Sequence, residues 1–314
     1  MSIEGYTNFK WFLVTSPAEY VAHVQTNRPA KFNAYHEPMW LELKQIFDKL
    51  SVDSNVRAVV FSGAGDKAFT TGLDVQAASQ GGILGGGENK LDIARQSVQI
   101  RRHVEEFQSC ITSLEKCEKP VIAAMHGYAF GLAIDLSCCA DIRIASKDTK
   151  FSVKEVDIGL AADIGTLARL PKIVGNHSWV KEVTLTARIF TAEEARQVGF
   201  VSHVEENKEK AVAKAVGLAT LIASKSPIAV QGTKELLNHA RENTTAASKS
   251  HIPSTLRTFT NYDSSSLHWS LELCRFTHRR CQGRSSLWDS EDEAYILEVV
   301  VGEKLQFISQ CICV

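Results

Sequence analysis

The stretch KPVIAAMHGYAFGLAIDLSCCADIRIAS, residues 119–146, constrains the fold more than any other part of the chain. Its first part, 120–127, is an apolar run without polar alternation, which is typical of a strand buried on both faces. The apolar run at 131–140 predicts a helix, and 140–146 predicts another strand. Strand, helix and strand in this order predict an α/β architecture with buried strands.

The same alternation extends along the chain. Four further segments with strand or helix patterns precede this stretch: strands at 18–26 and 56–62, and helices at 36–55 and 91–116. Between the second strand and the second helix lies the loop KAFTTGLD, residues 67–74. From 191 to 240 the composition becomes rich in helix formers, and Thr191 with Glu194 forms the pattern of a capping box.

The 314 residues are enough for one large domain or for one domain with an appendage. We expect an alternating core over 1–200, a helical region over 201–246 and a poorly ordered tail over 247–314, where Ser, His and Arg recur without a sustained period. The stretch QGGILGGGEN, residues 80–89, is expected to be a flexible surface loop. It lacks the Lys-Ser/Thr of a phosphate-binding loop.

Composition excludes several classes of function. The net charge of −1 gives no global field that would recruit nucleic acid or an anionic membrane, so any site for an anionic ligand must be local. No apolar run approaches the length of a membrane span, and no secretory or transit peptide is readable at the N-terminus. The eight cysteines form no CxxC pair and no zinc pattern, which favours a reducing compartment and no metal centre.

Three carboxylates are the candidate catalytic groups: Asp135, Glu155 and Asp163. Each lies among apolar and small residues, where an ionised side chain is costly unless it is paired. Burial raises the pKa of a carboxyl group, and a raised pKa suits proton transfer near neutral pH. We therefore predict that the three acids converge inside an apolar cleft.

Two loops could bind a developing negative charge. Gly127 and Gly131 flank the turn before the predicted helix at 131–140, where backbone N–H groups can face a ligand. The loop at 67–74 could supply a second N–H near Leu73. Two such donors would polarise a carbonyl or thioester oxygen, stabilise the enolate formed on loss of a neighbouring proton, and give a nearby carboxylate the role of base.

Residues 18 to about 245 resemble the enoyl-CoA hydratase/isomerase (crotonase) superfamily. The resemblance rests on NRPAKFNA, KAFTTGLD, the stretch 119–146 and FSVKEVDIGLAADIGTLARLPKIVG. Within the superfamily, the three acids together are similar to those of the Δ3,5-Δ2,4-dienoyl-CoA isomerases, whereas hydratases have Glu in place of Asp135 and no acid at position 163. The resemblance implies a spiral of ββα units followed by a helical region, trimers that can pair into hexamers, and a peroxisomal or mitochondrial location.

The resemblance also implies residue roles. Leu73 and Leu132 would form an oxyanion hole through their backbone N–H groups, and an acyl-CoA thioester would lie along five loop residues: Gly72, Leu73, Asp74, Val75 and Gln76. Glu155 would remove a proton from C2 of a 3,5-dienoyl-CoA, Asp163 would return a proton at C6, and Asp135 would orient the pair. CoA is part of the substrate, and the reaction requires no metal or redox cofactor.

Two departures from the family pattern stand out. Most relatives have glycine where Leu132 stands, so a side chain must be accommodated at the oxyanion hole. The second departure is the C-terminal part, which leaves the family pattern near Ala247 and ends in Cys-Ile-Cys-Val. We interpret it as an altered C-terminus that arises from an alternative reading of the gene.

Structural roles remain open for each candidate. Asp135 could cap a neighbouring turn, Glu155 could pair with Lys154 or Arg169, and Asp163 could be a helix N-cap. Arg28 and Lys31 could meet CoA phosphates or serve only at the surface. Two other functions also remain open: an enoyl-CoA hydratase that activates water, and a non-catalytic acyl-CoA-binding subunit.

Overall fold

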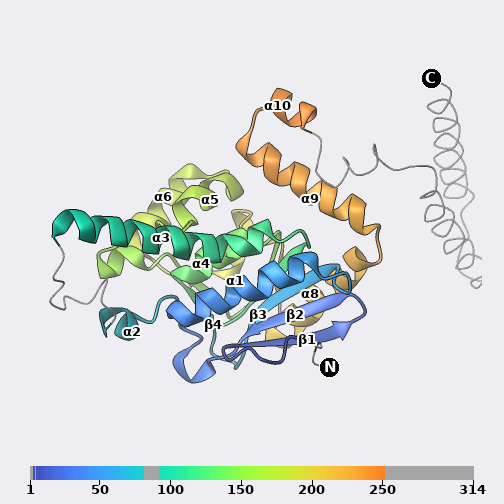
Figure 1. Cartoon of the computed structure of the whole chain (residues 1–314), viewed down its shortest axis with the longest axis horizontal. Helices are drawn as coiled ribbons and strands as arrows, with labels where there is room; N and C mark the ends of the chain where they lie inside the picture. Colours follow the sequence, from blue (N-terminus) through green and yellow to red (C-terminus); the bar gives the residue numbers. More distant parts are fainter. Residues whose placement is uncertain (1–2, 4, 81–91, 252–314) are drawn as a thin grey trace, which may run out of the picture. The chain divides into compact units, whose positions relative to one another are not determined.

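The structure is a computed structural model that describes residues 3, 5–80 and 92–251 (Figure 1). Its strands are β1 Phe12–Ala18, β2 Val21–Thr26, β3 Ala58–Gly63, β4 Ala68–Thr70, β5 Val121–Met125, β6 Tyr128–Phe130, β7 Ile142–Ser146, β8 Lys150–Ser152, β9 Phe190–Thr191 and β10 His203–Glu205. Its α-helices are α1 Glu37–Val52, α2 Val75–Gln80, α3 Ile93–Lys116, α4 Leu132–Cys139, α5 Thr166–Ile173, α6 His177–Thr186, α7 Ala192–Gln197, α8 Lys208–Ala223, α9 Pro227–Glu242 and α10 Thr245–Ser250. Two 3₁₀ turns, η1 Pro29–Lys31 and η2 Glu155–Ile158, complete the set.

Two sheets organise these elements. The larger has the order β1-β2-β3-β5-β7-β10 and is parallel except for the β1–β2 pair, and the smaller has the order β4-β6-β8-β9. The chain repeatedly adds one strand to the larger sheet, one strand to the smaller sheet and then a helical segment. β3 and β4, then β5 and β6, then β7 and β8 follow this rule. This repetition confirms the predicted spiral of ββα units.

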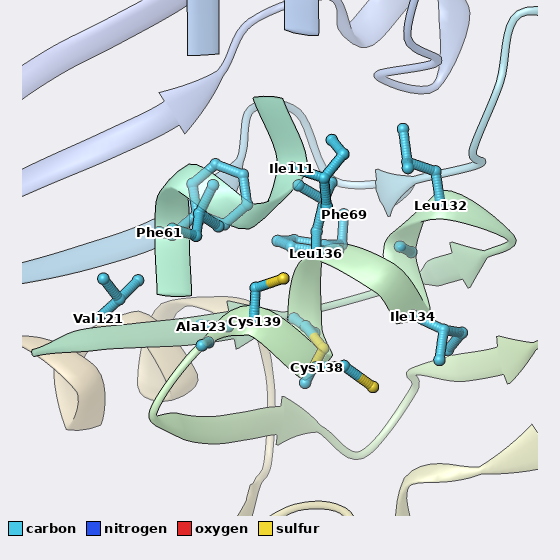
Figure 2. Close-up of a cluster of buried hydrophobic side chains, with 14 of the residues drawn as sticks. Phe61, Phe69, Ile111, Val121, Ala123, Leu132, Ile134, Leu136, Cys138 and Cys139 are labelled. Atoms are coloured by element: carbon cyan, nitrogen blue, oxygen red, sulfur yellow. The ribbon is translucent and has the colours of Figure 1, made fainter. Parts of the chain in front are cut away.

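The neighbouring strands β3 and β5 of the larger sheet are buried on both faces, as their apolar runs predict. In β3, Val59 and Phe61 belong to the main core, in which α1 and α3 lie side by side and α4 contacts α3 (Figure 1). Ala58 and Val60 point the other way, toward a row of small residues on α8: Ala211, Ala215, Ala219 and Ala223. Figure 2 shows the main core around Phe61, with α4 contributing Leu136 and Cys139. Small side chains on α8 let this helix approach the sheet closely.

Some boundaries differ from the sequence-based prediction. The segment predicted as one strand at 18–26 contains the turn of a hairpin between β1 and β2, and Tyr20 in that turn has a left-handed φ of 60°. β1 was missed because it contains Pro17, which interrupts a strand pattern but is tolerated at the edge of a sheet. The loop predicted at 67–74 contains the short strand β4, and the helix-rich region contains β10.

The helical region packs on the larger sheet and belongs to the same compact unit as that sheet. The Lys234 ammonium anchors α9 through Asp141 at 2.7 Å and the Lys119 carbonyl at 3.1 Å. Within the described ranges, no single helix is long and apolar enough to cross a membrane, although α8 and α9, bent by 111°, pass the same test as a pair.

Two predictions fall largely outside the described residues. Of the segment at 80–89, only Gln80 is described, as the last residue of α2. Of the tail at 247–314, only 247–251 is described, and 247–250 belongs to α10.

The predicted cap at Thr191 is confirmed, because its hydroxyl accepts the Glu194 N–H at 3.2 Å. The Glu194 carboxylate binds Arg188 and Trp179, so the reciprocal half of the capping box is absent there.

Candidate active site

The loops that carry Leu73 and Leu132 meet in the structure. Gly72 has a left-handed φ of 91°, which favours glycine. A Cβ on Gly72 would lie 2.9 Å from the carbonyl oxygen of Phe130 and 3.3 Å from the Leu132 nitrogen. The absent side chain at Gly72 therefore lets the first loop lie directly against the start of α4.

Hydrogen bonds on either side leave the Leu73 N–H unused. Tyr35 donates its N–H to the Gly72 carbonyl at 2.8 Å and accepts the Asp74 N–H at 2.7 Å. The Gly72 N–H is donated to the Thr70 hydroxyl at 3.1 Å. Within the described residues, the Leu73 N–H takes no part in these bonds. The loop is thus held in place while one of its donors stays available.

The start of α4 repeats this arrangement. The Gly131 N–H is donated to the Ser152 carbonyl at 2.9 Å, and the Gly131 carbonyl accepts the Ile134 N–H at 2.7 Å. Leu132 is the first residue of the helix, where an N–H has no partner within the helix. Two free N–H groups on adjoining loops are the geometry expected of an oxyanion hole.

The departure at Leu132 leaves the backbone intact. The left-handed residue at this turn is Gly131, with φ 55°, and Leu132 already has a helical conformation. Its side chain is 4% exposed and packs into the main core, where Figure 2 shows it on the same side of α4 as Phe69 and Ile111. The extra side chain is accommodated by the core, so the N–H keeps its position at the helix start.

Asp135 lies in the first turn of α4 and is buried. Its Oδ1 accepts the Thr166 N–H at 2.6 Å, so it does cap the start of α5, as one structural interpretation held. Burial raises the pKa of Asp135 to about 7, and the charge of Glu155 adds to this effect. A carboxyl group with this pKa changes its protonation state near neutral pH, so the structural role does not exclude a chemical one.

Glu155 opens η2 and is half-buried beside the helix start. A Cβ on Gly131 would lie 3.2 Å from its Oε1. Its Oε2 is buried and has no hydrogen-bond partner among the described residues. Burial raises the pKa of Glu155, and the charge of Asp163 raises it further. A buried carboxylate oxygen without a partner is costly, and a proton relieves that cost.

The ion pairs weighed for Glu155 are made by other residues. Lys154 pairs with Asp157 at 2.7 Å. Arg169 pairs with Glu115 at 2.7 Å, and a second arginine, Arg241 of α9, binds the same carboxylate. Glu155 is therefore not the partner of Lys154 or Arg169 in this structure.

Asp163 differs from the other two acids because its residue is exposed. It lies in the turn between η2 and α5, and its backbone carbonyl accepts a hydrogen bond from Gln108 Nε2 at 2.7 Å. The N-cap position of α5 belongs to Gly165, so Asp163 is not the cap. The prediction that all three acids lie inside an apolar cleft does not hold for Asp163 in the single chain, because Asp163 is exposed between the buried Ala162 and the half-buried Ile164.

Exposure increases along the predicted acyl-CoA loop, from Gly72 to Gln76. Gly72 is buried, Leu73 and Asp74 are half-buried, and Val75 and Gln76, the first residues of α2, are exposed. The residues that support this loop were missed by the sequence-based analysis, although the motif NRPAKFNA contains several of them. Asn33 is the clearest case, since it is fully buried with φ 57° and donates to the carbonyls of Ala64 and Ala68, each at 2.9 Å.

One group of side chains among the described residues has the spacing to hold a metal ion. Among the described residues, the side chains close enough to hold one ion together are Glu37, His103 and Glu106, on α1 and α3. The two glutamates are exposed, and the three predicted catalytic acids are not part of the group. Exposed acidic groups of this kind are common without a bound ion.

Comparison with known proteins defines the class to which the chain belongs. Residues 17–272 match the family model described as enoyl-CoA hydratase/isomerase. The crystal structure of the enoyl-CoA hydratase from Bacillus anthracis superposes with a TM-score of 0.68 at 28% identity, over 76% of this chain and 86% of that one. The chain therefore belongs to the enoyl-CoA hydratase/isomerase family. The family match extends to residue 272, beyond the departure that the sequence-based analysis placed near Ala247.

Two curated relatives within this family have the same named activity. The mitochondrial Δ3,5-Δ2,4-dienoyl-CoA isomerase of Rattus norvegicus is 47% identical over 236 residues, covering 75% of this chain and 71% of the relative. The peroxisomal Δ3,5-Δ2,4-dienoyl-CoA isomerase of Arabidopsis thaliana is 38% identical over 242 residues, covering 77% of this chain and 85% of the relative.

Proposed function

We propose that this protein is an isomerase that converts 3,5-dienoyl-CoA into 2,4-dienoyl-CoA during the β-oxidation of unsaturated fatty acids, in mitochondria or peroxisomes. The similarity to dienoyl-CoA isomerases from both compartments supports the reaction and the location. One structural observation carries the chemistry: Glu155, whose Oε2 is buried and has no partner among the described residues, lies beside Gly131, the residue before the Leu132 N–H.

Glu155 would act as the base. The thioester oxygen would accept hydrogen bonds from the N–H groups of Leu73 and Leu132, which lowers the cost of negative charge on that oxygen. Glu155 would then take the proton from C2, and the electron pair of the C–H bond would spread over the dienolate and the thioester oxygen. Burial raises the pKa of Glu155, which makes it a stronger base toward a weakly acidic C–H.

Asp163 would deliver the second proton. A protonated Asp163 would donate to C6, a C–H bond would form there, and the double bonds would move to positions 2 and 4. Glu155 then holds a proton and Asp163 has lost one, so the site must reset before the next turnover. The exposure of Asp163 supports this step, because an exposed carboxylate exchanges protons with water once product has left.

Asp135 would orient the other two acids, Glu155 and Asp163. Its side chain reaches from the first turn of α4 to the start of α5, where its Oδ1 accepts the Thr166 N–H three residues after Asp163. It is also close enough for the charge of Glu155 to raise its pKa. In its protonated form it leaves the ionised Glu155 without a second negative charge beside it. We assign it the role of positioning residue.

The direct test is turnover of a 3,5-dienoyl-CoA by pure protein, followed by the longer-wavelength absorbance of a diene conjugated with the thioester. Active protein is expected to produce this absorbance. The variant Glu155→Gln should reduce turnover by about 10³-fold, because it removes the base while keeping the shape of the side chain. Asp157→Asn, a change at an exposed acid in the same turn, should leave turnover unchanged. Well-folded protein without turnover would refute the proposal.

The proximity of the two inner acids, Asp135 and Glu155, favours one alternative, a 2-enoyl-CoA hydratase in which these two acids activate water. In this case the two inner acids carry the whole reaction and Asp163 is not needed. Hydration of a 2-enoyl-CoA at high rate, retained in Asp163→Asn, would favour the alternative. Slow hydration beside fast isomerisation would exclude it.

The active protein is further proposed to be a homotrimer or a pair of trimers. Four exposed apolar side chains, unusual on the surface of an isolated chain, lie close in sequence to the acids: Val156, Ile158, Leu160 and Leu167. Burial of these side chains against a second copy would remove their apolar surface from water. Sedimentation equilibrium at micromolar concentration measures the mass directly, and a stable monomer with full activity would contradict the proposal.

A further inference from the structure

Arg28 makes its contacts inside the protein. The sequence left it between a contact to CoA phosphates and a surface role. In the structure its Nη1 donates to Asp74 Oδ2 and to the Ala34 carbonyl, each at 2.8 Å. Its side chain is 17% exposed, and its guanidinium group lies over the Trp11 ring at 5.9 Å. Two internal partners and a ring hold Arg28 in one orientation.

The partner of Arg28 is the residue that follows the oxyanion donor. Asp74 comes directly after Leu73, and its second oxygen, Oδ1, accepts the Ala77 N–H of α2 at 3.1 Å. The Asp74 N–H binds Tyr35, which also binds the Gly72 carbonyl. Backbone bonds therefore fix Leu73 on both sides, and the Arg28–Asp74 ion pair is the side-chain contact that fixes the loop from outside.

The other end of Arg28 is held equally firmly. Its backbone N–H is donated to Asn33 Oδ1 at 2.9 Å, and Asn33 in turn binds the carbonyls of Ala64 and Ala68 next to β4. Thr70, which accepts the Gly72 N–H, donates its hydroxyl to the Asn33 carbonyl at 2.7 Å. Arg28, Asn33 and Asp74 thus form one bracket around the loop that carries Leu73.

We propose that Arg28 is a positioning residue of the reaction, which fixes the direction of the Leu73 N–H through Asp74 and does not bind the phosphates of CoA. This inference rests on the proposed function, since the direction of this N–H has a consequence only if a thioester oxygen accepts from it. An oxyanion contact strengthens as charge develops in the transition state. Loss of the bracket should therefore lower kcat and change KM little.

The experiment compares two substrates that differ only in the distal part of the thiol. Steady-state kinetics are measured with a 3,5-dienoyl thioester of CoA and with the same acyl thioester of pantetheine, which lacks the phosphates. Removal of one oxyanion donor costs about 10²–10³-fold in kcat, so misalignment in Arg28→Ala should cost about 10–10²-fold. The same factor is expected with both thioesters, because the lost contact is to Asp74.

A double-mutant cycle tests the route through Asp74. Asp74→Ala should lower kcat by a similar factor, and the double variant Arg28→Ala/Asp74→Ala should be little worse than either single variant, because both remove one contact. Lys44→Ala, which removes an exposed ion pair with Asp48 on α1, should leave kcat and KM unchanged. Arg28→Gln and Asp74→Asn keep most of the side-chain volume, and they replace any alanine variant that fails to fold.

The contrary results are distinct. A rise in KM for the CoA thioester that disappears with the pantetheine thioester would show that Arg28 binds phosphate. Unchanged kcat in folded Arg28→Ala, or additive losses in the double variant, would also overturn the inference. Absence of isomerisation by the unaltered protein on either thioester would instead remove the proposed function.

Discussion

The two halves of the candidate site are built differently. The inner half is the start of α4, where every residue of the helix is buried, including Asp135. The outer half is the segment 155–163, which runs from the half-buried Glu155 through exposed residues and the buried Ala162 to the exposed Asp163. One oxyanion donor, the Leu132 N–H, and one acid, Asp135, are thus part of the core, whereas the second proton-transferring acid, Asp163, is on the surface.

This difference separates residues that stabilise the site from residues that only take part in the reaction. The inner half is fixed by hydrogen bonds and packing, so a change there should affect both stability and turnover. The outer half makes few contacts, so a change there should affect turnover and leave stability nearly unchanged.

The largest effect is expected at the outer half. Asp163→Asn should lower isomerisation by about 10³-fold, because no group then donates the proton at C6. Its melting temperature should change little, since among the described residues the Asp163 side chain makes no hydrogen bond. Removal of the C2 proton by Glu155 should persist. It is measured as incorporation of deuterium from D₂O at C2 of the substrate by NMR.

Loss of both isomerisation and C2 exchange in Asp163→Asn would assign Asp163 to the first step. It would contradict the assignment of Glu155 to C2 and of Asp163 to C6. Glu155→Gln provides the matched comparison, because it should lose exchange and isomerisation together.

An intermediate effect is expected where the two oxyanion loops touch. In Gly72→Ala the new Cβ would lie 2.9 Å from the Phe130 carbonyl and force the loops apart, and the φ of 91° would be strained. We expect kcat to fall about 10²-fold and the free energy of unfolding to fall by about 1–3 kcal/mol. Kinetics and urea unfolding on the same preparation measure both effects.

Gly199→Ala separates strain from contact. Gly199 has a similar φ of 83°, but a Cβ there would meet no atom within 4 Å. This variant should lose stability and keep its kcat. Equal losses of kcat in the two glycine variants would mean that the contact between the loops does not set the oxyanion geometry.

Particular residues show how far the sequence could lead. Asp135 and Glu155 were readable because an acid inside an apolar run must be paired or used, and Gly127 and Gly131 were readable because tight turns favour glycine. The exposure of Asp163 could not be read, since small and apolar neighbours also occur in a surface turn. The partner of Arg28 could not be read either, because Asp74 is 46 residues away in sequence and only the folded chain brings the two together.

The same limit applies to the fold. The strands β3 and β5 were readable from continuous apolar runs, because both of their faces are buried. β1 was not, since it pairs on one side only and contains a proline. Short strands such as β4 and β10 carry too few residues for a period, and their pairing is fixed by neighbours far along the chain.

A change in the pH dependence of stability is expected at Asp135. Burial raises its pKa from an ordinary value near 3.8 to about 7, so the folded protein binds a proton there that the unfolded chain releases. Stability is therefore lost as the pH rises from about 4 to 7, and it stays low above pH 7.

Asp135→Asn keeps the oxygen that accepts the Thr166 N–H and removes the charge, so its stability relative to the unaltered protein should increase by about 2–3 kcal/mol between pH 5 and pH 8. Urea unfolding at the two pH values measures this gain, with the exposed Asp48→Asn as a control that should show none. A gain in stability together with a loss of turnover would show that the inner half of the site retains a costly buried acid for its chemistry. If the difference in stability between Asp135→Asn and the unaltered protein did not change with pH, Asp135 would already be neutral or already solvated in the folded protein.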